Sequence, residues 1–170
     1  MIDVDEFRRL FQAQVSSVAV ITAQAGERRA GFTATAVCSL QDDPPSLIVS
    51  INRKTNAYPL IVESKRFAVN FLAADQEHVS ARFAKHAADL DEAAMKFDAA
   101  GDWCLSAHGA LLLQNATAVA ECELVQSVEL NTHAILIGNI LDAEVSETAK
   151  PLLYGFKRYV RIPETREQHA

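Results

Sequence analysis

The chain has 170 residues, enough for one domain with a sizeable core but too few for two ordinary domains. Its net charge of -6 comes from 22 acidic and 16 basic residues that are mixed along the sequence, which gives no reason to expect a nucleic-acid partner or an anionic membrane surface. Cys38, Cys104 and Cys122 lie far apart without ligand spacing, so we expect no disulfide framework and no metal site, but three buried or half-buried thiols in a reducing cytosol.

The first part of the chain is predicted to form one helix followed by apolar strands. Residues 3–15 have helical apolar spacing behind Asp3 and Asp5, and the acidic start MIDVDEF is unlike a leader peptide. SVAVITAQ is predicted to be a strand and AGER a turn. RRAGFTATAVCSL is predicted to be one long second strand, which ends at the DDPP corner, and SLIVSI to be a fully apolar strand.

The second part is richer in strands. Residues 56–64 are predicted to form a helix with Pro59 in its first turn, FAVNFL a strand, ADQEHVSARFAKHA a helix and residues 86–110 mostly loop. TAVAECELVQSVEL, HAILIGNILDAEVS and LLYGFKRYVRI are β-branched and broken by short turns. We therefore expect a mainly β fold, an antiparallel barrel with appended helices, as a single domain over residues 1–162 with a flexible tail at 163–170. No apolar run approaches the ~20 residues of a membrane span, so we expect a soluble cytoplasmic protein.

Within the stretch GFTATAVC, residues 33–36 have almost no side-chain bulk on either face of their strand. Gly31 permits an unusual backbone angle at the start, and the run Thr33, Ala34, Thr35 and Ala36 would let a flat ligand approach the main chain. A tightly packed barrel wall explains the same composition equally well.

The strand SLIVSI runs directly into Asn52, Arg53, Lys54 and Thr55 and then into a helix. Two cations and a hydroxyl beside the free amides of a helix start predict a phosphate site. The alternative is an ordinary capped helix start with solvated charges.

Taken together, GFTATAVCSLQDDPPSLIVSINRKTNAYP and the later FAVNFLAADQEHVSARFA closely resemble the flavin reductase-like domain, the short-chain NAD(P)H:flavin reductases of two-component monooxygenases. The resemblance extends from about Phe7 to Tyr159. It implies an antiparallel split β-barrel of the FMN-binding type and a homodimer with the flavin near the subunit interface. It also implies FMN or FAD as cofactor, NADH or NADPH as reductant, and supply of reduced flavin to an oxygenase or to another acceptor. The sequence leaves that acceptor open, from an oxygenase to a reducible metal centre such as a corrin cobalt. The few phosphate anchors predict that the flavin exchanges as a diffusible substrate.

The same resemblance assigns site residues. It places Thr33, Ala34, Thr35 and Ala36 along the isoalloxazine ring, and Ser50, Asn52, Arg53 and Thr55 at the ribityl and phosphate end. It assigns His133 as the catalytic residue on the nicotinamide side and places Tyr154 near the same pocket. Arg82 and Lys85 are assigned as added charge near the phosphate. Phe97 and Trp103 are expected to cover the loop side of the pocket. Each assignment has a structural alternative: a filler role for the histidine, barrel packing or a dimer contact for the tyrosine, and a solvated helix face for the two cations.

The sequence departs from the family pattern at two places on the nicotinamide side. Asn131-Thr132 stands where a Gly-Asp often precedes the histidine, and residues 157–160 differ from the usual Arg-Gly-x-Tyr-His ending. No triad, HExxH or P-loop motif is present, and hydride transfer between two cofactors needs none of them. The sequence thus predicts an NAD(P)H-dependent flavin reductase, with an FMN-binding electron-transfer or sensing module and a ligand-free interaction barrel as alternatives.

Overall fold

The computed structural model describes residues 1–99 and 102–163, so residues 100–101 of the predicted loop and nearly all of the predicted tail lie outside the described residues. The helices are α1 (Val4–Gln12), α2 (Ala57–Ser64), α3 (Glu77–Phe83) and α4 (Leu90–Ala99). The strands are β1 (Ser16–Ser17), β2 (Ala19–Ala25), β3 (Arg28–Ala34), β4 (Val37–Asp42), β5 (Pro45–Asn52), β6 (Arg66–Phe71), β7 (Trp103–Leu105), β8 (Leu111–Leu113), β9 (Ala118–Glu129), β10 (His133–Val145), β11 (Leu153–Gly155) and β12 (Arg158–Val160). Within the described ranges, no helix has the length and apolar character needed to cross a bilayer.

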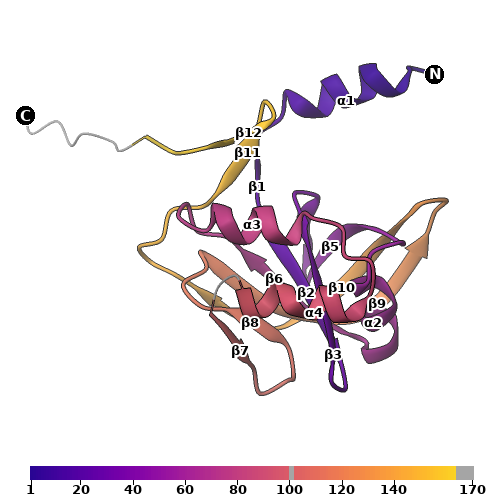
Figure 1. The fold of residues 1–170 in the computed structure, drawn as a ribbon, viewed down its shortest axis with the longest axis vertical. Coiled ribbons are helices and arrows are strands. Elements are labelled where there is room, and N and C mark those ends of the chain that lie inside the picture. Colours follow the sequence, from indigo (N-terminus) through magenta and orange to yellow (C-terminus); the bar gives the residue numbers. More distant parts are fainter. Residues whose placement is uncertain (100–101, 164–170) are drawn as a thin grey trace, which may run out of the picture.

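The main sheet has seven strands in the order β3-β2-β6-β9-β10-β5-β4, and every neighbouring pair is antiparallel (Figure 1). Its two outermost strands, β3 and β4, follow each other in the chain with only Thr35 and Ala36 between them. Three peptide steps span at most about 11 Å, so the sheet must roll until the end of β3 and the start of β4 come together at the link. The predicted mainly β architecture with flanking helices is confirmed.

The link between the two edges shows that the predicted second strand is wrong. RRAGFTATAVCSL is not one strand, because its pairing changes from β2 before the link to β5 after it. The role expected of Gly31 is also wrong: its φ is not positive, and it is needed for space, since a Cβ there would lie 2.9 Å from the Ile21 carbonyl oxygen and 2.9 Å from the Phe83 ring. The backbone of β3 and the α3 helix thus pack closely just before the link.

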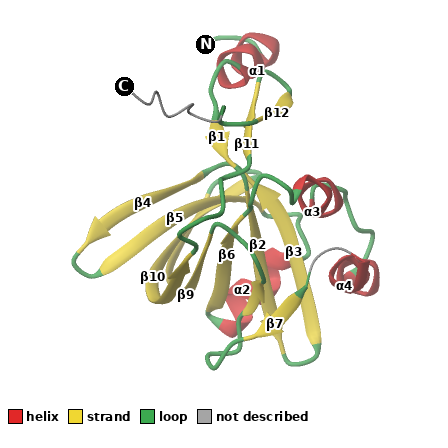
Figure 2. Cartoon of the chain, turned by 90° about the vertical axis from the view of Figure 1, so that its left-hand side faces the viewer, coloured by secondary structure: helices red, strands yellow, loops and turns green. Residues whose placement is uncertain are grey.

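Helix α1 and a small sheet of β1, β11 and β12 lie together beyond one end of the main sheet (Figures 1 and 2). The Asp3 side chain accepts hydrogen bonds from the backbone amides of Asp5 and Glu6, and the Glu6 carboxylate accepts one from the Asp3 amide, which forms a capping box. None of the helix residues is buried, and Phe7, Leu10 and Phe11 are each more than half exposed. The helix is well formed, yet its apolar side has little to cover it within the chain.

Residues 86–110 were expected to be mostly loop, and this prediction is wrong. Helix α4 begins after Asp89, whose carboxylate accepts a hydrogen bond from the Glu92 amide, and the hairpin β7–β8 follows. The helix packs its buried Ala93 and Phe97 against the body of the protein. In a stretch containing so many alanines, the two buried positions are too few to give a clear helical pattern of apolar residues.

The cysteines differ from expectation as well. Cys38 on β4 and Cys104 on β7 are exposed, and only Cys122 on β9 is buried. Burial, assisted by the adjacent Glu121 carboxylate, raises the pKa of the Cys122 thiol to about 12. All three are free thiols, as predicted.

Candidate functional site

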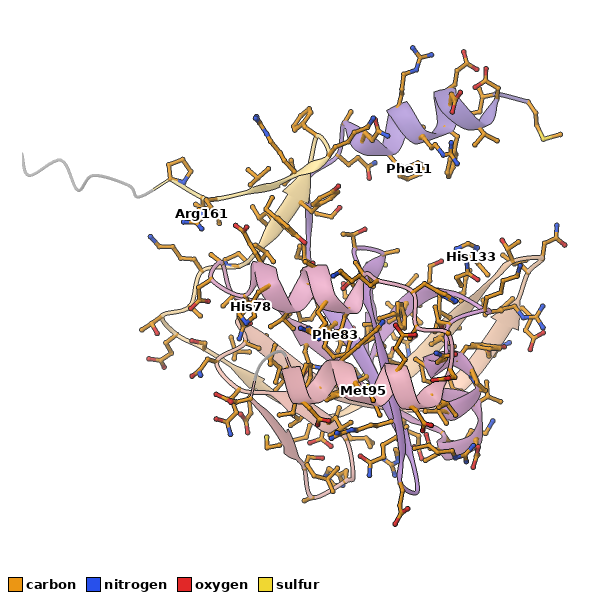
Figure 3. All side chains as sticks on the ribbon, viewed as in Figure 1. Phe11, His78, Phe83, Met95, His133 and Arg161 are labelled. Atoms are coloured by element: carbon orange, nitrogen blue, oxygen red, sulfur yellow. The ribbon has the colours of Figure 1, made fainter. Side chains whose placement is uncertain are left out.

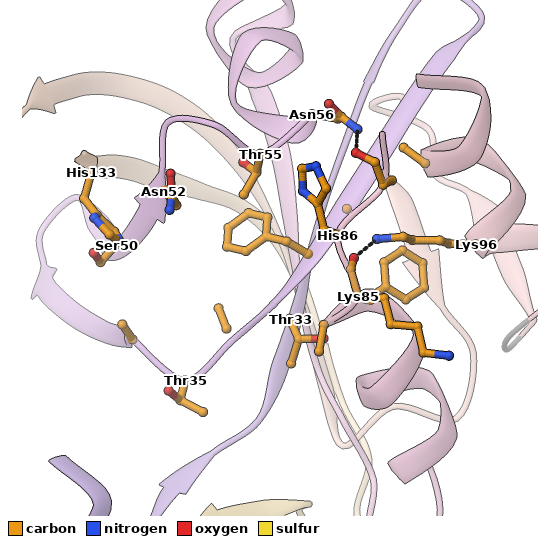
Figure 4. Close-up of a pocket in the computed structure, with 18 residues that line it drawn as sticks. Thr33, Thr35, Ser50, Asn52, Thr55, Asn56, Lys85, His86, Lys96 and His133 are labelled. Carbon is orange, nitrogen blue, oxygen red and sulfur yellow. Dashed lines mark hydrogen bonds between the residues drawn. The ribbon is translucent and has the colours of Figure 1, made fainter. Parts of the chain in front are cut away.

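A pocket of about 400 Å³ lies where the chain crosses from β3 to β4. Figure 4 shows Ser50, Asn52 and His133 on one side and His86 and Lys96 on the other, with Thr33 and Thr35 along the wall between them. The lining comes from the edges of the rolled sheet, the start of α2, the loop after α3, and α4: Gly31, Phe32, Thr33, Ala34, Thr35, Ala36, Ser50, Asn52, Thr55, Asn56, Phe83, Ala84, Lys85, His86, Ala87, Ala93, Lys96 and His133.

The small residues of the β3–β4 link leave the room that the sequence suggested. Ala34 is buried, whereas Thr35 and Ala36 are exposed at the pocket. The Thr33 hydroxyl donates a hydrogen bond to the Ser80 carbonyl at 2.7 Å, so this side chain ties β3 to α3. Thr33 therefore shapes the wall, while Thr35 keeps its hydroxyl near the open side of the pocket.

The start of α2 leaves polar groups without internal partners. The Thr55 hydroxyl oxygen is buried and has no hydrogen-bond partner in the described chain. Asn56, at the N-cap position, makes no side-chain capping bond, and its side-chain NH2 group donates to the carbonyls of Ala87 and Asp89 at 3.1 and 2.9 Å. A buried orphan hydroxyl next to an uncapped helix start fits an anionic or hydroxyl-bearing ligand, and phosphate groups prefer such positions.

Arg53 is not part of the pocket lining. Its guanidinium contacts the Glu129 carboxylate at 2.6 Å, and the Tyr58 hydroxyl donates to the other oxygen of the same carboxylate at 2.7 Å. The Arg53 amide donates to the Thr132 carbonyl at 3.0 Å. This arginine therefore joins the segment after β5 to the turn between β9 and β10.

His133 is the first residue of β10 and pairs with Asn52 of β5 in the register of the sheet. Cross-strand partners share a face, so the histidine lies on the same side of the sheet as Asn52 and Ser50 (Figure 4). Figure 3 marks the place of His133 in the whole chain. Its Nδ1 lies 2.8 Å from the Thr132 hydroxyl oxygen. The imidazole is exposed at the pocket and not packed in the core.

The remaining predicted site residues separate into two groups. Lys85 lines the pocket, but Arg82 is exposed on α3 outside the lining. Tyr154 lines a second groove of about 270 Å³ between α1 and the β11–β12 turn, which shares Thr35 with the main pocket. The structure thus brings together the β3–β4 link, Ser50, Asn52, Thr55, Lys85 and His133, and leaves Arg53, Arg82 and Tyr154 outside the main pocket.

Sequence reasoning missed Lys96 and His86 as lining residues. The sequence predicted a helix through residue 87 and mostly loop beyond it, whereas α3 ends at Phe83 and α4 begins at Leu90. Lys96 is 8% exposed, and its Nζ donates a hydrogen bond to the Lys85 carbonyl. Burial lowers the pKa of Lys96, while the nearby Glu92 carboxylate opposes this shift. The combination of Asp89 and Glu92, spaced as in a capping box, is the signal that could have predicted a helix here.

Phe97 and Trp103 do not cover the pocket directly. Their rings pack against each other at a centroid distance of 5.0 Å, and both pack against Phe83 at 5.0 and 5.3 Å respectively. Phe83 is the member of this aromatic cluster that lines the pocket. The two aromatic residues therefore support the wall from behind.

Comparison with known proteins gives a consistent set of matches. The family model of the flavin reductase like domain matches residues 12–163. The FMN reductase (NADH) RutF of Pseudomonas syringae pv. syringae is 34% identical over 157 residues, which are 92% of this chain and 85% of that protein. The NADH:FAD oxidoreductase SgcE6 of Streptomyces globisporus superimposes with a TM-score of 0.86 at 27% identity, over 96% of this chain and 98% of that one. BorF, the flavin reductase component of a bacterial two-component tryptophan halogenase, gives a TM-score of 0.83 at 28% identity, over 96% and 100%.

Proposed function

Because this chain belongs to the flavin reductase-like domain family, we propose that it is an NADH-dependent flavin reductase, which reduces FMN or FAD by hydride transfer. The observation that carries the proposal is the pocket itself. Its small-residue wall fits a flat ring, and the orphan Thr55 hydroxyl beside the uncapped start of α2 fits the phosphate end of a flavin nucleotide. SgcE6 is also known in complex with NAD and FAD fragments, which supports both ligand classes for this pocket.

Each residue group has a role in this proposal. The backbone of Thr33 to Ala36 lies against the ring, Ser50, Asn52 and Thr55 bind the ribityl and phosphate end, and Lys85 adds positive charge. When bound, the flavin accepts a hydride from the nicotinamide, and this chemistry belongs to the two cofactors. His133 orients the nicotinamide by a hydrogen bond from the side of β10 and does not need to act as a base.

Three sequence assignments take a different form in the proposal. Arg53 is engaged by Glu129, and exposed Arg82 lies outside the lining, so the proposal gives neither arginine a direct contact with the phosphate. Tyr154 borders the second groove, next to the pocket edge at Thr35. With few direct phosphate anchors, flavin binding is expected to be modest, and the reduced flavin can leave.

We also propose that reduced flavin diffuses to a partner oxygenase or another acceptor. The modest anchoring of the phosphate supports this, as does the likeness to BorF, which serves a halogenase as a separate component. A second protein that consumes reduced flavin should therefore be supported across a dialysis membrane that passes only small molecules. The consumer in this test is an acceptor protein that needs no dioxygen, so that the experiment can be run anaerobically. If its reduction stops completely there, with free flavin on both sides, transfer by diffusion is wrong.

A homodimer is the form we propose for the working enzyme. The apolar side of α1, with Phe7, Leu10 and Phe11 exposed, and the exposed edge strand β4 are surfaces that a second copy would cover. Light scattering of the intact chain and of Phe11→Glu tests this. A dimer that dissociates in the variant supports the proposal, and a monomeric wild-type chain at micromolar concentration contradicts it.

The activity is tested by anaerobic titration of the protein with NADH and NADPH in the presence of FMN and then of FAD. We expect NADH to be oxidised in proportion to added free flavin, many turnovers per protein. If bound flavin is reduced only once and added free flavin does not sustain NADH oxidation, an electron-transfer module with a permanently bound flavin is the correct function. If neither flavin binds, the proposal fails altogether.

A further inference from the structure

The residue before His133 holds its imidazole. The Thr132 hydroxyl oxygen lies 2.8 Å from His133 Nδ1, at the point where the β9–β10 turn enters the strand. We propose that Thr132 is a positioning residue, which fixes the His133 ring so that Nε2 carries the hydrogen and acts as a donor toward the pocket. The inference rests on the proposed function only for its consequence, since the tautomer of the histidine exists with or without a ligand.

The backbone around Thr132 is well fixed. Its carbonyl accepts the Arg53 amide at 3.0 Å, and the Leu130 amide donates to the His133 carbonyl at 2.8 Å across the turn. The Arg53 guanidinium also contacts the carboxylate of Glu129, the last residue of β9 before the same turn. The turn is therefore joined to the segment after β5 by main-chain and side-chain bonds, and the Thr132 hydroxyl is presented from a defined position.

A separation of 2.8 Å fits a hydrogen bond in either direction between the Thr132 hydroxyl and Nδ1. We infer the direction in which the hydroxyl donates, because a hydroxyl hydrogen can rotate toward Nδ1, which a carboxylate at this position could not offer. In a neutral imidazole one nitrogen donates and the other accepts, so an Nδ1 that accepts leaves the hydrogen on Nε2. The ligand group that fits such a donor is a carbonyl oxygen, as in the carboxamide of a nicotinamide.

The identity of residue 132 decides which tautomer of His133 is favoured. An aspartate at this position, as the family resemblance leads one to expect, has an acceptor-only carboxylate and would draw the hydrogen to Nδ1, so that Nε2 becomes an acceptor. A threonine hydroxyl can donate. Thr132 therefore reverses the hydrogen-bonding character that the pocket side of His133 presents in its neutral form.

The first experiment is ¹⁵N NMR of the histidine side chains in the full chain without ligand, at about pH 8.5, where an ordinary imidazole is neutral. The His133 signals are identified by their loss in His133→Gln. We expect the Nε2–H form in the wild-type chain and in Thr132→Ser, and a shift to the Nδ1–H form in Thr132→Asp. A wild-type His133 in the Nδ1–H form, or an aspartate variant whose tautomer does not change, overturns the inference.

The second experiment compares Thr132→Val, which keeps the shape of threonine but removes the hydroxyl, with Thr132→Ser and with Asn131→Ala as a control in the same turn. The KM for NADH should rise about three- to tenfold in the valine variant, as expected for one hydrogen bond, and return in the serine variant, with unchanged FMN affinity. Equal kinetics in the valine and wild-type proteins overturn the positioning role. A wild-type chain that does not oxidise NADH refutes the proposed function instead, and the NMR result still decides the tautomer.

Discussion

Replacing Thr55 by valine should weaken FMN binding and at the same time stabilise the protein without ligand. A buried hydroxyl with no partner costs ~1 to 3 kcal/mol, and valine has nearly the same shape without the polar group. The free energy of unfolding should therefore rise by about 1 kcal/mol, which corresponds to roughly 2 to 4 °C in Tm for a chain of this size. A hydrogen bond to a charged phosphate contributes ~1.5 to 3 kcal/mol, so the Kd for FMN should rise about 10- to 150-fold.

Two measurements test the expected gain in stability and the expected loss of FMN affinity. Thermal or urea unfolding without ligand gives the stability change, and calorimetry with FMN and with riboflavin gives the two affinities. Thr55→Ser is the matched control, because it keeps the hydroxyl, and riboflavin should lose less affinity than FMN because it has no phosphate. A valine variant that is less stable than the wild type and binds FMN normally would show that the hydroxyl has a structural partner and that the phosphate lies elsewhere.

Three further results are expected. His133→Ala should raise the KM for NADH or slow hydride transfer in stopped flow while the Kd for FMN stays nearly unchanged, and a tenfold change in flavin dissociation with normal hydride transfer would contradict the placement of the histidine. Because burial lowers the pKa of Lys96, the unfolded chain binds more protons at this residue than the folded chain does. The wild type should therefore gain stability relative to Lys96→Met as the pH rises toward the ordinary lysine value of 10.5. A stability difference that does not change with pH would argue against the lowered pKa. In the native protein a thiol reagent should modify Cys38 and Cys104 readily but Cys122 only on unfolding, and equal rates would refute the burial of Cys122.

The parts of the fold that the sequence predicted well are those with a strong local pattern. The first helix follows from Asp3 and its apolar spacing, and the long apolar strands β5, β9 and β10 lie within a residue or so of the predicted segments. The break at Thr35 and Ala36 was not predictable in the same way. Small residues are compatible with a continuous strand and with a crossing alike, and the choice depends on which distant strands offer hydrogen bonds.

The site shows the same division. The backbone-lining stretch Thr33 to Ala36 and the hydroxyl of Thr55 were identified from composition and position, and both line the pocket. The direction of the Arg53 side chain was not predicted from the sequence, because it depends on Glu129. Glu129 is far away in sequence and reaches the arginine only because β9 and β5 both pair with β10. Long polar side chains choose among several partners of similar strength, so their orientation is decided by the tertiary structure.

The two-residue link between the sheet edges ties one wall of the pocket to the length of the chain. A side-chain substitution at Thr35 or Ala36 can change what this wall presents, but the end of β3 and the start of β4 stay within the same three peptide steps of each other. At this crossing the wall therefore cannot widen beyond what the link allows. A single glycine inserted after Thr35 would add one peptide step to this limit and so relax the spacing of the two strand ends, without changing any side chain that lines the pocket.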